Sequence, residues 1–171
     1  VVSTTLTARL QRRGFGPLPG YRLFAVLDGA AALESAVLAM WPSACIQRCL
    51  VHKERNLYGY LRNGDHAEAA RLWQRLRLAQ GEVAGREALA QLRAFLLPLN
   101  AAATASLDEA GEALITLHKL NVPATLNGSL LSTNAIENVM RNYRGQTAKV
   151  SRWRLETNQL SRWTATALLH L

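Results

Sequence analysis

Short apolar runs and helical patterns alternate along the first third of the chain. Residues 21–27 form an apolar run that ends at Asp28 and predicts a buried strand with an acid at its carboxyl end, where α/β sheets place their chemistry. Residues 30–41 have the apolar spacing of a helix packed on that strand, and residues 44–51 predict a second short strand. Residues 52–61 follow as a helix with interleaved basic and aromatic side chains.

The sequence around these elements leaves two roles open for Asp28. It can be a chemical group at the sheet edge, or it can be the N-cap of the Ala-rich helix that follows. Both roles can hold, because helix starts and active-site edges often coincide. Before this segment, residues 3–13 predict the end of a helix, which glycines and prolines then break.

Three amphipathic helical patterns without strand signals occupy residues 63–127. Their apolar stripes are Ala69, Leu72, Trp73 and Leu76; Leu89, Leu92, Phe95 and Leu96; and Leu107, Ala110, Leu114 and Leu117. The third helix is expected to open at a capping box, Ser106 to Glu109. An aromatic residue within such a stripe is usually a core residue, so we expect Trp73 to be buried rather than to stack on a base.

The stretch from Leu131 to Asn138 predicts the start of another helix, because small polar residues precede a carboxylate and then apolar positions. Glu137 can act as a capping residue, because it follows Asn134 by three positions. A second interpretation uses Arg141 and Arg144, which lie one and two helical turns later. One carboxylate beside two guanidinium groups suits a metal-bound phosphodiester.

The last segment, residues 156–171, predicts a helix with one apolar face. That face contains Leu160, Trp163, Thr164, Ala167 and Leu168. Just before it lie Lys149, Arg152, Trp153 and Arg154, a mixture of basic and aromatic residues that suits contact with nucleic acid. The plainer alternative is a capping helix with solvated arginines.

Length and composition indicate one ordinary domain, or part of a larger protein, with enough apolar residues (49%) for a core. There is no apolar run of the length that a membrane span requires, and no leader that indicates secretion. The two cysteines lie too close in sequence to staple the fold, so we expect a reduced, cytoplasmic protein.

The formal net charge of +8 is distributed unevenly. Residues 63–127 contain six basic and seven acidic residues, a net charge of −1, which leaves +9 for the flanking segments. A basic surface on those flanks fits a polyanion such as DNA. Seventeen of the twenty basic residues are arginine, which a GC-rich coding bias could also produce, but that bias does not explain the uneven distribution.

Cys45, Cys49 and His52 raise the question of zinc. A tetrahedral zinc site needs four ligands, and the spacing supplies no second pair, so we do not expect zinc here. The alternative is two small buried cysteines on a strand and a histidine at a helix start.

Three motifs in order resemble the Mutator-like transposases of bacterial insertion sequences. The sequence Ser-Thr-Asn-Ala-Ile-Glu at residues 132–137, followed by Arg141 and Arg144, resembles the glutamate motif of that family. Residues 26–30, Val-Leu-Asp-Gly-Ala, resemble the segment with its second catalytic aspartate. Residues 47–56, with Cys49 and His52, resemble its Cys-x-x-His block. The resemblance runs from about residue 20 to the region of residues 150–153.

The resemblance implies a DDE transposase with an RNase H-like catalytic domain, in which Asp28 and Glu137 are catalytic and hold the metal. Two Mg²⁺ ions, roughly 4 Å apart, would stabilise the attacking and leaving oxygens of a phosphodiester. Water, and then a DNA 3′-hydroxyl, would be the nucleophile. The implied partners are double-stranded DNA at the transposon ends and the target, with a possible homo-oligomer. The implied location is the bacterial cytoplasm, at the nucleoid.

These implications give a mainly helical α/β fold in three segments. Residues 1–62 would be a partial RNase H-like segment, residues 63–127 an all-α insertion between the second acid and the glutamate, and residues 128–171 the returning catalytic helix with a basic C-terminal helix. The basic residues expected to bind DNA are Arg48, Lys53, Arg55, Arg141, Arg144, Lys149 and Arg152.

The sequence departs from the family pattern in two places. Residues 1–27 contain no Asp or Glu, so the first catalytic aspartate is missing, and we expect a gene fragment or truncated copy that is inactive by itself. Met140 replaces an asparagine that is common in relatives. The competing hypothesis is a non-catalytic helical module that binds DNA or another partner through the same basic flanks.

Overall fold

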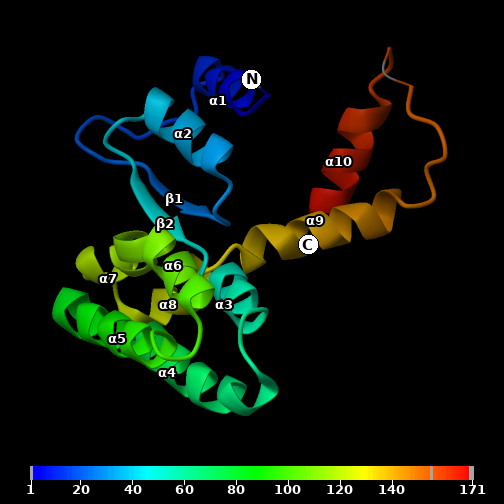
Figure 1. The fold of residues 1–171 in the computed structure, drawn as a ribbon. Coiled ribbons are helices and arrows are strands. Elements are labelled where there is room, and N and C mark those ends of the chain that lie inside the picture. Colours follow the sequence, from blue (N-terminus) through cyan, green and yellow to red (C-terminus); the bar gives the residue numbers. More distant parts are fainter. Residues whose placement is uncertain (1, 155, 170–171) are drawn as a thin grey trace. The chain divides into compact units, whose positions relative to one another are not determined.

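The chain folds into two compact units, Val1–Ser132 and Thr133–Leu171. The computed structural model describes residues 2–154 and 156–169, and the side chains of residues 2 and 124 are outside that description. The fold is mainly helical with one small parallel sheet (Figure 1), which confirms the predicted fold class at this level. No helix in the described ranges is long and apolar enough to cross a membrane.

The first unit begins with a β-α-β arrangement. Strand β1 (Phe24–Leu27) pairs in parallel with β2 (Cys45–Arg48), and helix α2 (Ala31–Met40) connects them. Leu27 lies opposite Arg48, so the carboxyl ends of both strands meet at one edge of the sheet. Helix α1 (Val2–Arg12) contacts α2. The second strand is shorter than predicted, because the next helix already starts at Leu50.

Helix α3 (Leu50–Tyr58) therefore begins two residues earlier than the sequence analysis placed it. Its N-cap is Cys49, whose sulfur accepts a hydrogen bond from the backbone N–H of His52 at 3.5 Å. A short 3₁₀ turn, η1 (Asn63–Asp65), leads into α4 (His66–Leu78). Helix α5 (Gly81–Leu96) runs beside α4 (Figure 1).

The predicted capping box at Ser106 to Glu109 is wrong. Helix α6 (Ala101–Ala110) begins five residues before Ser106, at an N-cap formed by Asn100. The side-chain oxygen of Asn100 accepts hydrogen bonds from the backbone N–H groups of Ala102 (2.8 Å) and Ala103 (3.0 Å). Asparagine is among the best N-cap residues, and it takes this role because it satisfies two otherwise unpaired donors.

After α6 the chain continues in short turns of helix. These elements are η2 (Gly111–Ile115), α7 (Thr116–Lys119), η3 (Ala124–Leu126) and α8 (Asn127–Leu130). They complete the first unit.

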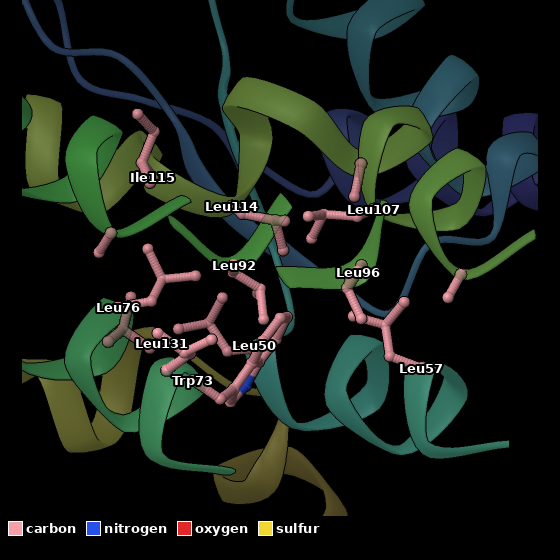
Figure 2. Close-up of a cluster of buried hydrophobic side chains, with 14 of the residues drawn as sticks. Leu50, Leu57, Trp73, Leu76, Leu92, Leu96, Leu107, Leu114, Ile115 and Leu131 are labelled. Carbon is pink, nitrogen blue, oxygen red and sulfur yellow. The ribbon is translucent and has the colours of Figure 1, made fainter. Parts of the chain in front are cut away.

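Helices α3 to α7 enclose one apolar core (Figure 2). The predicted stripe on α4 is confirmed, since Ala69, Leu72, Trp73 and Leu76 are all buried. On α5, Leu92 and Leu96 are buried, and the two other predicted stripe residues pack against the core. Trp73 is 1% exposed and is a core residue, as predicted.

The same core joins the sheet segment to the helical insertion. Leu50 and Leu57 of α3 belong to it together with residues of α4, α5 and α6. Residues 1–62 and 63–127 therefore lie in a single compact unit.

Polar groups connect β2 to η2 and α7. The side chain of Gln47 is fully buried; its amide NH₂ donates to the carbonyl of Leu114 at 3.0 Å, and its oxygen accepts from the backbone N–H of Leu117 at 2.9 Å. The Thr116 hydroxyl donates to the carbonyl of Ile46 at 2.6 Å. These bonds satisfy backbone groups where η2 and α7 meet the strand.

The second unit consists of α9 (Asn134–Thr147) and α10 (Gln159–Leu169), which pack against each other. On α10, Ala167 is buried, whereas Trp163 and Thr164 are half-buried. Helix α10 starts three residues later than predicted, and the last two residues of the predicted range lie outside the described residues.

Candidate functional site

Asp28 directly follows β1 and is exposed at the carboxyl edge of the sheet. One oxygen of its carboxylate, Oδ1, accepts a hydrogen bond from the backbone N–H of Ala30 at 3.1 Å. The N-cap of α2 is Ala30, so Asp28 lies two residues before the cap and is not the N-cap residue. The strand thus presents an exposed carboxylate in a turn fixed by its own side chain.

Gly29 allows a close approach of Arg48 to this turn. Its φ of +107° lies in the region that favours glycine. A Cβ atom at this position would lie closer to Nη2 of Arg48 than two non-bonded atoms can approach. The Arg48 guanidinium therefore covers the backbone of the residue next to Asp28.

Glu109 of α6 holds the two nearly buried cations Arg48 and Lys53. The Arg48 guanidinium donates to both oxygens of the Glu109 carboxylate, at 2.8 and 3.0 Å. Nζ of Lys53 donates to the same carboxylate at 2.9 Å and to the carbonyl of Ser106 at 2.9 Å. A weaker contact of 3.8 Å joins Arg48 to Glu34 of α2. The network links β2, α2, α3 and α6.

This network includes two of the residues that were expected to bind DNA, Arg48 and Lys53. Arg48 is 7% exposed and Lys53 is 5% exposed, and both are paired with an acid inside the protein. Charged residues buried in this way serve the fold, because each needs its partner to offset the loss of hydration. Arg55, in contrast, lies exposed on α3.

Arg48 and Lys53 also set the protonation of Glu109. Hydrogen bonds from Arg48 and then from Lys53 lower the pKa of the Glu109 carboxyl group, against an opposing effect of burial. Glu109 therefore stays ionised at neutral pH and remains the ion-pair partner of both cations.

Cys49 and His52 lie together at the start of α3. The Nδ1 atom of His52 is 3.2 Å from the sulfur of Cys49, and the Cys49 side chain is 1% exposed. Across residues 2–154 and 156–169, no three His, Cys, Asp or Glu residues gather as the ligands of one metal ion do. The contact gives this block a capping role at the helix start.

In the second unit, Glu137 lies in the first turn of α9 and is half-buried. The Thr133 hydroxyl donates to Oε1 of Glu137 at 2.6 Å. Thr133 is the N-cap of α9, one residue before the predicted Asn134. Glu137 is thus the fourth residue of the helix, and it departs from the capping-box spacing, which places the acid at the third.

One face of α9 carries a shallow cavity of about 340 Å³. Its lining residues are Ile136, Glu137, Met140, Arg141 and Arg144. The structure thus brings the predicted glutamate and both predicted arginines together on one helix face. The arginines are exposed, and Met140 takes part in the same lining.

The sequence was compared with known families and with curated proteins. Residues 3–161 match the family described as "Transposase, Mutator family". This chain belongs to the Mutator family of transposases. It is also 28% identical, over 146 residues, to the transposase for insertion sequence element IS905 of Lactococcus lactis subsp. lactis (strain IL1403). That alignment covers 85% of this chain and 36% of the relative, so the chain spans about a third of the length of that protein.

In this Mutator-family chain, cations of the helical insertion are mostly paired with acids. The ion pairs are Arg71–Glu68, Arg77–Glu54, Arg86–Glu82, Arg86–Glu112, Arg93–Asp108 and Lys119–Glu112. Most of the basic residues in this segment are thus paired with acids. Arg75 takes part in none of these ion pairs.

The basic residues of the second unit are arranged differently. Residues 133–171 contain six basic and two acidic residues. Within the described part of that unit, Arg141, Arg144, Lys149 and Arg152 form no ion pair, and all four are exposed. Uncompensated cations on an exposed surface attract polyanions.

A second cavity, of about 510 Å³, lies between the loop after α9 and the start of α10. Four cations line it, Lys149, Arg152, Arg154 and Arg162, together with Trp163. Arg162 and Trp163 were not predicted as site residues, because the helical spacing indicated only that Trp163 lies on the apolar face of α10. Glu109 was not predicted either, because its cationic partners lie 61 and 56 residues away.

Asp28 and Glu137 fit a magnesium-type ion in the chemistry of their donors, since such ions prefer carboxylate oxygens. Asp28 is exposed, and one of its two oxygens carries the Ala30 bond described above. Glu137 receives the Thr133 hydroxyl on one oxygen. Each carboxylate therefore suits one ligand position.

Proposed function

We propose that this chain is the part of a Mutator-family transposase that supplies two metal-holding acids, Asp28 and Glu137, and a DNA-binding surface. The parent protein would cut and join DNA at the ends of an insertion sequence. The observation that carries the proposal is the exposed carboxylate of Asp28 at the carboxyl end of β1, in a chain that belongs to this family.

The two acids have the properties that this role needs. A pair of divalent cations, when bound, supplies charge stabilisation for the attacking and leaving oxygens of a phosphodiester. Asp28 offers its carboxylate from a turn that its own side chain, Gly29 and Arg48 hold in shape. Glu137 offers its carboxylate from the first turn of α9, where the Thr133 hydroxyl orients it.

The proposal extends to an RNase H-like catalytic domain, of which β1, α2 and β2 would form part. It also includes a third acid. Residues 1–27 contain no Asp or Glu, and the chain matches 36% of the length of its relative, so we place the third acid outside the matched segment.

The DNA-binding residues of the proposal are Arg55 in the first unit and Arg141, Arg144, Lys149 and Arg152 in the second. All five are exposed and take part in none of the ion pairs described above. Guanidinium groups bind phosphate oxygens in a fork geometry, so Arg141 and Arg144 would bind the DNA backbone beside Glu137. Arg48 and Lys53 are left out of this set, because both are buried and paired.

The alternative function, a non-catalytic DNA-binding module, draws on the same uncompensated cations of the second unit and needs neither acid. The two proposals differ in whether Asp28 and Glu137 matter for strand cleavage.

Salt dependence of DNA binding tests the proposed surface. Each phosphate that a cation neutralises should contribute about −0.9 to the slope of log K against log salt concentration. Replacing Arg141, Arg144 and Arg152 by Ala should weaken duplex binding and flatten the slope by up to about 0.9 for each phosphate that is no longer bound. The measurement is a salt titration of the binding constant by fluorescence anisotropy.

The matched control replaces Arg71, Arg86 and Arg93 by Ala. These residues are exposed too, but each is paired with an acid of the helical insertion. We expect them to change the slope little. Equal effects from the two triple variants would contradict the assignment of Arg141, Arg144 and Arg152 to DNA binding.

A further inference from the structure

The loop after α9 and the first turns of α10 form a basic cavity with an aromatic wall. Lys149, Arg152, Arg154, Arg162 and Trp163 line it, and its volume is about 510 Å³. Its lining contains no Asp or Glu. A cavity of this size lies in the usual range for small organic ligands.

Local hydrogen bonds give this loop a defined shape. The backbone N–H of Arg154 donates to Oε1 of Gln159 at 2.8 Å, and the Thr157 hydroxyl donates to the carbonyl of Arg154 at 3.0 Å. The N–H of Gln159 in turn contacts the Thr157 hydroxyl at 3.3 Å. The basic loop is thus tied to the N-terminal end of α10.

The cations specify the charge of the ligand. No ion pair involves Lys149, Arg152, Arg154 or Arg162 in the part of the chain that the structure describes, so their charges are available to an anion. Four cations around one cavity can neutralise several negative charges, and a nucleic acid strand offers them as consecutive phosphates.

The aromatic wall specifies the form of the nucleic acid. Trp163 is half-buried and lines the cavity. Single-stranded nucleic acid binds such platforms by stacking its bases on them. Bases inside a duplex are already stacked on each other and do not present a free face.

We propose that this cavity binds an unpaired nucleotide of single-stranded DNA, with the phosphates on the four cations and the base against Trp163. The proposal rests on the proposed function, because cutting and joining DNA ends would produce strands with unpaired bases. It adds Arg154, Arg162 and Trp163 to the substrate-binding residues.

The experiment compares two DNA hairpins that differ only in a single-stranded 3′ tail. The whole 171-residue chain should bind the tailed hairpin about tenfold more tightly than the blunt one, as expected for one base stacked on an aromatic ring. Trp163→Leu should remove this difference and leave binding to the blunt hairpin unchanged. Trp163→Phe should keep most of the difference, because phenylalanine retains a stacking face.

Trp153→Leu is the matched control. Trp153 is also half-buried and lies ten residues earlier, but it does not line the cavity. We expect this variant to keep the preference for the tailed hairpin. Arg154→Ala and Arg162→Ala should weaken binding to the tailed hairpin and flatten its salt slope.

The possible outcomes distinguish a failure of the nucleotide site from a failure of the proposed DNA binding. Equal binding of the tailed and blunt hairpins by the unaltered chain would overturn the nucleotide site and leave duplex binding intact. Equal losses on both hairpins in Trp163→Leu, with no rescue by Trp163→Phe, would overturn the stacking role. Absence of binding to either hairpin would instead contradict the DNA-binding part of the proposed function.

Discussion

The carboxylate of Glu109 is shared by two cations that have almost no contact with solvent. The side chains of Arg48 and Lys53 are 8% and 6% exposed, whereas that of Glu109 is 55% exposed. Removing the negative charge would take from Arg48 and Lys53 the carboxylate that they share and leave Arg48 its weaker contact with Glu34, which costs more than the loss of an ordinary hydrogen bond. The stability of this corner of the fold therefore depends on one acid that sequence patterns assign to a helix cap.

We predict that Glu109→Gln lowers the free energy of unfolding by about 1–3 kcal/mol. The amide keeps the shape of the side chain but loses the charge. The measurement is urea denaturation at neutral pH. The control is Glu82→Gln, which breaks an exposed pair within α5 and should cost less than about 1 kcal/mol. Equal costs for the two variants would contradict the role of Glu109.

The difference in unfolding free energy between the unaltered chain and Glu109→Gln depends on pH, because the pKa of Glu109 is lowered. A carboxyl group with a lower pKa in the folded state stabilises the fold above the pKa of the unfolded chain, about 4.3. This contribution disappears as the pH falls through the lower, folded-state pKa. The stability gap between the unaltered chain and Glu109→Gln should therefore shrink in acid.

The turn at Asp28 depends on Gly29. Its positive φ disfavours a side chain, and the Arg48 guanidinium occupies the space that a Cβ atom would need. We predict that Gly29→Ala destabilises the protein by about 1–3 kcal/mol. The control, Gly64→Ala, changes a glycine of η1 with open space around it and should cost much less. Thermal unfolding of both variants provides the comparison.

At the scale of elements, helix α6 does not begin at the local motif that predicted its start, because tertiary contacts use the residues of that motif. Ser106 and Glu109 have the spacing of a capping box, but both lie inside α6 and bind Lys53. The helix starts at Asn100, whose side chain also donates to the carbonyl of Tyr60 at 3.1 Å. One asparagine thus caps α6 and ties it to the segment after α3.

We predict that Asn100→Ala lowers the stability by about 1 kcal/mol, the usual cost of losing an N-cap. Ser106→Ala should cost less, because the Lys53 contact to its hydroxyl is long, at 3.3 Å, and the carbonyl contact remains. Chemical denaturation of both variants measures this. A larger effect at Ser106 would support the capping box and contradict the observed helix start.

The elements differ in how far the sequence could predict them. The stripes of α4 and α5 were predictable, because each helix turns one apolar face to a common core at regular spacing. The burial of Arg48 and Lys53 was not, because their partner Glu109 lies more than fifty residues away and only the fold brings the three together. The cavity between the loop after α9 and the start of α10 could not be predicted either. Trp163 and Arg162 join the loop cations in its lining only because the chain turns before α10.

At the scale of the whole molecule, the chain separates two kinds of charge. Most cations of the helical insertion in the first unit are paired with acids, whereas Arg141, Arg144, Lys149 and Arg152 of the second unit form no ion pair with the described residues. Asp28 belongs to the first unit and Glu137 to the second. The proposed chemistry therefore needs both units and the third acid.

The most direct test of the proposed roles of Asp28 and Glu137 is to measure strand cleavage by a full-length Mutator-family transposase that contains this segment. Asp28→Asn and Glu137→Gln are the test variants, because each amide keeps its oxygen for Ala30 or Thr133 and loses only the charge that holds a metal. Asp65→Asn and Glu156→Gln are matched controls outside the proposed site. We predict that both test variants abolish cleavage with unchanged melting temperatures, while the controls cleave normally. Cleavage retained in Glu137→Gln would contradict the catalytic role and return Glu137 to a residue that only stabilises the start of α9.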